Sequence, residues 1–182
     1  MDIGKTLYLK KRDQWRKWLL DNHEKEKDIW LIYYKKHTGK ESIPYNDAVE
    51  EALCFGWIDS IVKRIDEDKN AQRYSPRKKN SFLSATNKER VRKLIKEGKM
   101  TDAGLSIIKE KYEEKFFMPK DILESIMQNK IAYTNFKKFP KSYIRIRIGW
   151  IDDSRKRPEE FKKRLEYFIK KTEKNKKFGM IQ

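Results

Sequence analysis

The sequence predicts an α+β fold, in which a small antiparallel sheet flanked by helices is followed by an all-helical C-terminal module. Two runs rich in β-forming residues, 28–35 and 57–65, lie between helical patterns in the first half of the chain. After Pro76 the apolar residues recur at helical spacing. Proline and charged residues then mark a boundary. We therefore expect an α+β domain over residues 1–117 and a small basic helical module over residues 118–182.

The first predicted elements are a helix over residues 10–21 and the strand over residues 28–35. The helix places Trp15, Trp18 and Leu19 on one face. The strand, DIWLIYYK, is rich in residues that favour β-structure, and the turn residues HTGK follow it. Each element has one apolar side, so both are expected to cover the same core.

A second helix is predicted over residues 44–55, because a proline suits its first turn and Gly56 suits the position that ends it. The strand over residues 57–65 follows. After a polar turn, residues 72–75 return antiparallel to it. Pro76 ends that strand, since proline lacks the N–H group that a sheet needs.

Helices account for the rest of the chain. Thr86 or Asn87 is expected to cap a helix that Gly98 closes, and another helix runs over about residues 101–115. Further segments with helical spacing between proline and polar boundaries are 119–128, 133–139, 141–152 and 158–171. Residues 143–150, YIRIRIGW, fit a strand as well as a helix, because periodicity does not decide so short a run.

Composition limits the classes of protein that the chain can belong to. Hydrophobic residues make up 37% and aromatic residues 13%, enough for a core, so the chain is not expected to be disordered as a whole. The single cysteine excludes an internal disulfide framework. No apolar run is long enough to cross a bilayer, and the first residues do not resemble an export signal. We expect a cytoplasmic protein with no membrane insertion.

The net charge of +17 has two interpretations. Most basic residues are lysines interleaved with acidic residues at helical spacing, which is typical of solvated helix faces. The excess lies toward the carboxyl end, where basic helices could instead bind nucleic acid. The residues that would do so in this alternative are Lys137, Lys138, Arg145, Arg147, Arg155, Lys156 and Arg157.

The strongest candidate site lies between residues 57 and 87. We expect a surface there that binds a small anionic ligand, formed by Trp57, Asp59, Lys63, Arg73, Tyr74, Arg77, Lys78, Ser81 and Asn87. Arginine offers a planar fork for carboxylate or phosphate, and a carboxylate can orient it. On a regular strand Asp59 and Lys63 would face the same way. The alternative is a salt-bridged sheet surface with hydroxyls that cap turns and helices.

No catalytic residue is assigned, and neither a metal nor a cofactor is expected. The spacing of His23, His37 and Cys54 fits no zinc pattern. Cys54 lies in the apolar run ALCF, which is typical of a small buried residue. The chain shows no phosphate-binding loop, nucleophile elbow or dinucleotide fingerprint. An enzyme would need a perturbed acid or base near Asp59, so we favour a binding protein over an enzyme.

Several motifs together resemble one known family. WLIYYKKHTGK, IPYNDAVEEALCFGWIDS, YSPRKKNSFLSATN and GKMTDAG occur in an order similar to that of the YdeI/OmpD-associated family, also labelled bacteriocin-protection proteins. The carboxyl part, from MPKDILESIMQ to EYFIKK, resembles the short helical module of that family. The resemblance favours a helix for YIRIRIGW.

The resemblance implies a role in stress or antimicrobial-peptide tolerance, but no reaction, ligand or catalytic residue. A strongly basic protein repels cationic peptides, so direct sequestration is not expected. The partner that we expect is a small anionic ligand or another protein, with nucleic acid as the alternative.

Overall fold

In a computed structural model, which describes residues 2–112 and 115–179, the chain divides into two compact units. The N-terminal unit comprises residues 1–82 and 90–112, and the C-terminal unit comprises residues 83–89 and 113–182. The boundary expected after residue 117 lies between the last helix of the first unit and the next helix, and it stays a prediction.

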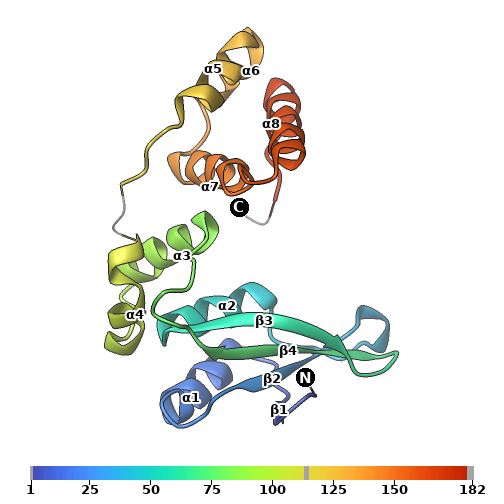
Figure 1. Cartoon of the computed structure of the whole chain (residues 1–182). Helices are drawn as coiled ribbons and strands as arrows, with labels where there is room; N and C mark the ends of the chain where they lie inside the picture. Colours follow the sequence, from blue (N-terminus) through green and yellow to red (C-terminus); the bar gives the residue numbers. More distant parts are fainter. Residues whose placement is uncertain (1, 113–114, 180–182) are drawn as a thin grey trace. The chain divides into compact units, whose positions relative to one another are not determined.

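A four-stranded sheet forms the N-terminal unit (Figure 1). Its strands are β1 (Thr6–Leu7), β2 (Ile29–Tyr34), β3 (Trp57–Arg64) and β4 (Lys69–Pro76), in the spatial order β1-β2-β4-β3. The pairs β2–β4 and β3–β4 are antiparallel, whereas β1 runs parallel to β2. The α+β class is therefore confirmed. Strand β1 was not predicted, because two residues carry no periodic signal.

The strand register assigns each side chain to one of two faces. Tyr74 pairs with Ile29, and Arg73 pairs with Trp30, so these two pairs lie on opposite faces. The face that carries Tyr74 packs against Trp15 of helix α1 (Arg12–Asn22), with ring centroids 5.5 Å apart, and we call it the helical face. The other face carries a small apolar cluster around Trp30, and we call it the Trp30 face.

The helices of this unit are α1 (Arg12–Asn22), α2 (Tyr45–Cys54) and α4 (Asp102–Tyr112), with a short 3-10 turn η1 (Lys36–Thr38). Trp15 and Leu19 are fully buried, as the helical spacing predicted. The helix expected over residues 101–115 is described through Tyr112. Residues 113 and 114 lie outside the described part, and Lys115 is not helical.

Helix α3 (Ala85–Lys96) belongs to both units: residues 85–89 are part of the C-terminal unit, and residues 90–96 are part of the N-terminal unit. The predicted cap at Thr86 or Asn87 is wrong. Ser84 precedes the helix, and its Oγ accepts the Asn87 backbone N–H at 3.3 Å. Several residues that cap helices well occur in this stretch, and the sequence alone did not choose among them.

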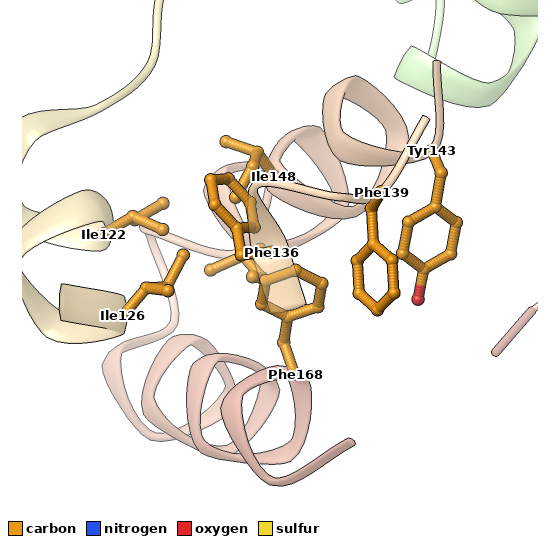
Figure 2. Close-up of a cluster of buried hydrophobic side chains, with 8 residues drawn as sticks. Ile122, Ile126, Phe136, Phe139, Tyr143, Ile148 and Phe168 are labelled. Atoms are coloured by element: carbon orange, nitrogen blue, oxygen red, sulfur yellow. The ribbon is translucent and has the colours of Figure 1, made fainter. Parts of the chain in front are cut away.

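The C-terminal unit contains α5 (Lys120–Gln128), α6 (Lys130–Phe136), α7 (Lys141–Asp152) and α8 (Pro158–Glu173). Helix α6 begins three residues before its predicted start, where the Asn129 side chain caps it. The ambiguous run at residues 143–150 is helical. Figure 2 shows the core that these helices share, in which Ile122, Ile148 and Phe168 from three different helices meet. None of the described helices combines the length and the apolar character that crossing a bilayer requires.

Candidate functional site

Two of the predicted site residues, Asp59 and Arg73, lie on opposite faces of the sheet. Asp59 pairs with Tyr74 in the register and so lies on the helical face. Arg73 lies on the Trp30 face, where its Nε and Nη2 donate to Asp28 Oδ2 at 3.0 and 2.7 Å. The structure therefore does not bring Asp59 and Arg73 into one surface.

Lys63 is also separated from Asp59. A regular strand would have placed both on one side, but the register shifts between Asp59 and Val62. This irregularity puts Lys63 opposite Ala71, on the Trp30 face. The prediction that the two side chains face the same way is wrong, because one extra residue in a strand moves all later side chains to the other face.

Asp59 is instead held by neighbours on the helical face. Its Oδ2 accepts the Tyr45 hydroxyl at 2.8 Å and the Gln72 Nε2 amide at 2.9 Å. Gln72 is buried, and Tyr45 begins helix α2. Sequence reasoning missed Gln72, although its position two residues before Tyr74 places it on the same face of the strand.

Tyrosine hydroxyls extend this polar cluster. Tyr33 and Tyr74 share a hydrogen bond of 3.0 Å. Burial raises the pKa of Tyr33 to about 12, and burial together with the neighbouring Asp59 raises the pKa of Tyr45 to about 12. Burial also raises the pKa of Tyr74 well above its usual value. All three phenols are thus protonated at neutral pH and act as hydrogen-bonding groups rather than as bases.

Arg77, which follows β4, is the most unusual of the predicted residues. Only 3% of it is exposed, and its backbone N–H donates to Gly56 O at 2.8 Å. Nη1 donates to Ser81 Oγ at 3.1 Å and to Phe82 O at 2.9 Å. Nε and Nη2 are sealed from solvent and have no hydrogen-bond partner within residues 2–112 and 115–179. Burial lowers the pKa of Arg77, against the opposing charge of Asp59.

The unpartnered edge of Arg77 is the one that other arginines of this chain use for carboxylates. Arg73 holds Asp28 through Nε and Nη2, and Arg145 holds Glu89 through the same two atoms at 2.7 and 2.5 Å. This edge matches two oxygens of a carboxylate or phosphate. In Arg77 the edge is buried and no acidic side chain among the described residues occupies it.

The remaining predicted residues have other surroundings. Trp57 is buried, and its Nε1 donates to His23 O at 3.2 Å, which explains it as a core residue. Lys78 is exposed beside Arg77, and Ser81 accepts from Arg77. Asn87 belongs to the C-terminal unit, inside the first turn of α3. Whether these residues bind a ligand stays a prediction.

The basic residues of the nucleic-acid alternative are not uniformly available. Arg145 is bound to Glu89, and Arg155 donates to Asp121 at 2.8 and 2.9 Å and to Asp152 at 2.5 Å. Arg147 is buried among aromatic rings. The others, Lys137, Lys138, Lys156 and Arg157, are exposed.

The potential metal ligands and the single cysteine have the following surroundings in the part of the chain that the structure describes. No three His, Cys, Asp or Glu side chains gather there in a way that could hold a metal ion. Cys54 is fully buried, and burial raises the pKa of its thiol to about 11. The thiol is therefore protonated at neutral pH and is a poor nucleophile.

Comparison with known families assigns each part of the chain. Residues 7–107, more than half of the chain, match the family described as Domain of unknown function (DUF8412). This chain belongs to that family. Residues 115–175 match the model described as Bacteriocin-protection, YdeI or OmpD-Associated, which confirms the predicted resemblance for the helical module. The sheet and Arg77 lie within the DUF8412 match. Neither the curated proteins nor the solved structures include a match to this chain.

Proposed function

We propose that this DUF8412 protein is a binding protein that recognises a small oxyanion, a carboxylate or a phosphate, through Arg77. The observation that supports this most directly is the buried Nε and Nη2 edge without a partner among the described residues. Each buried charged donor without a partner costs about 1–3 kcal/mol or more. A bound oxyanion would remove this cost and supply the missing negative charge.

The surroundings of Arg77 also support a binding role. Ser81 and Phe82 fix the other terminal nitrogen, so the guanidinium is held in one orientation before any ligand arrives. The phenols of the Asp59 cluster and the Cys54 thiol are protonated at neutral pH, so neither supplies a base or a nucleophile. We therefore favour binding over catalysis.

A cytoplasmic location and a role in stress or antimicrobial-peptide tolerance belong to the same proposal. The tolerance role is supported by the description of the family matched at residues 115–175. A net charge of +17 disfavours direct capture of cationic peptides. A role in antimicrobial-peptide tolerance would then depend on binding of the anion rather than on direct binding of the peptide.

The test is a titration of the full chain with sodium acetate and with inorganic phosphate at constant ionic strength. Isothermal calorimetry gives the affinity, and the Arg77 Nε–H signal in a ¹⁵N-correlated NMR spectrum reports contact. Removing a charge-assisted bidentate contact costs about 1.5–3 kcal/mol, so Arg77→Gln should bind at least tenfold more weakly.

Arg77→Lys keeps the charge but lacks the fork, so it should also lose most of the affinity. Arg64→Gln is the matched control, since Arg64 is an exposed arginine of β3 in the same unit. The proposal fails if neither anion moves the Arg77 signal further than sodium chloride does.

A further inference from the structure

Arg147 of α7 is a second buried cation without a carboxylate. Only 8% of it is exposed, and its side chain has no hydrogen-bond or ion-pair partner within residues 2–112 and 115–179. Its Cζ lies 4.9 Å from the ring centre of Phe178, 5.7 Å from Tyr143 and 5.9 Å from Trp150. These contacts attract the cation but satisfy none of its N–H groups. Burial also lowers the pKa of Arg147.

The three nitrogens of this guanidinium differ in access. Nε is sealed and has no partner among the described residues. Nη1 and Nη2 have no partner there either, but they are not sealed as Nε is.

The segment after α8 lies against these terminal nitrogens. The Phe178 N–H donates to the Tyr143 hydroxyl at 3.2 Å, which attaches the segment to α7. A Cβ added to Gly179 would lie 2.6 Å from Arg147 Nη1 and 2.7 Å from Nη2. Glycine, with a φ of +86°, is therefore needed where the segment meets the guanidinium.

The charges of residues 174–179 have one sign. Lys174, Lys176 and Lys177 precede Phe178, and residues 174–179 contain no acidic residue. The last turn of α8 adds Lys170 and Lys171, and its one acidic residue, Glu173, accepts from Asn129 Nδ2 at 3.0 Å. Arg147 is buried, without a counter-ion among the described residues, next to a segment that carries lysines. A doubly charged oxyanion neutralises more of this positive charge than a carboxylate does.

We propose that Arg147 binds a phosphate group through Nη1 and Nη2, at a site that residues 174–179 border. The site lies within the C-terminal unit and does not depend on Arg77. Its ligand is inorganic phosphate or the phosphate of a monoester, which share the same dianionic oxygens.

The experiment follows the Arg147 Nε–H signal, assigned through its own side-chain connectivity, while the full chain is titrated at constant ionic strength. One arm uses inorganic phosphate and the other uses adenosine 5′-monophosphate. We expect a saturable shift in at least one arm, and the tighter arm identifies the source. By calorimetry, Arg147→Gln should weaken this binding tenfold or more, whereas Lys163→Gln, an exposed charge change on α8, should not.

The site is distinguished from the Arg77 site by the variants. Arg77→Gln should leave the shift of the Arg147 signal intact. The proposal is overturned if phosphate and the monoester move that signal no further than sodium chloride does. If Arg147→Gln does not fold, the titration of the unaltered chain decides the question.

Discussion

The close approach of helices α2 and α4 yields a sharp stability prediction at Gly104. A Cβ on Gly104 would lie 2.2 Å from Cys54 O, 2.7 Å from Cys54 C and 3.0 Å from Leu53 O. All three are backbone atoms at the end of α2, so no side chain can rotate away. Gly104→Ala must therefore move α4 away from α2.

That movement affects the start of α4. The Thr101 backbone N–H and hydroxyl donate to Cys54 O at 3.1 and 2.6 Å, so a shift weakens both bonds. Overpacking destabilises the fold by about 1–3 kcal/mol, and each lost hydrogen bond destabilises it by about 0.5–1.5 kcal/mol. Replacing a helical glycine by alanine stabilises the helix by about 1 kcal/mol, which offsets part of this loss. We expect Gly104→Ala to lower the free energy of unfolding by about 2 kcal/mol.

The assay is urea unfolding followed by tryptophan fluorescence, because four of the five tryptophans lie in the N-terminal unit. Ser106→Ala is the control, since Ser106 is exposed on the same helix. Its free energy of unfolding should stay within about 0.5 kcal/mol of the unaltered chain. A Gly104→Ala variant as stable as Ser106→Ala would show that the two helices are not packed as closely as the structure has them.

Further predictions concern charge. Glu51 is 1% exposed and accepts from two arginines of α1 at 2.5 and 2.7 Å. Glu51→Gln should therefore lower the free energy of unfolding in urea by about 3–5 kcal/mol. The control Glu24→Gln, at an exposed position, should lower it little. Folding raises the pKa of Tyr33 and Tyr45 from 10 to about 12, so their contribution to the free energy of unfolding is complete below pH 10 and is lost as the pH rises toward 12. Phenolate absorbance and urea unfolding, measured across this pH range, check the prediction. Short DNA duplexes, tested by fluorescence anisotropy, should bind weakly at low salt and lose that binding as salt rises. The reason is that carboxylates or aromatic rings engage four of the seven basic residues of this alternative, Lys137, Arg145, Arg147 and Arg155. Tight, salt-resistant binding would contradict this.

Periodicity found most helices and the three longer strands, because these depend on local spacing of apolar residues. The burial of Trp15 and Leu19 on one face of α1 is an example. The cap of α3 was placed wrongly, since Ser84, Thr86 and Asn87 are all suitable by residue type. Which of them caps depends on where the preceding loop ends.

The candidate site shows the same division. Arg77 was predicted from its residue type, but its Asp59 and Arg73 companions separate onto two faces of the sheet. The irregularity in β3 that turns Lys63 away from Asp59 has no signature in the run WIDSIVKRI. Residue type thus indicated an anion-binding group, but not its neighbours.

Composition, periodicity and motif order were enough to predict the α+β class, the positions of most elements and the family resemblance of the helical module. Which polar groups have partners became known only from the folded arrangement of the chain. The Arg73 and Arg77 side chains are identical in type, yet one edge holds Asp28 and the other has no partner among the described residues. The reason is physical: the pairing of a charged group depends on burial and on strand register, and residues distant in sequence set both.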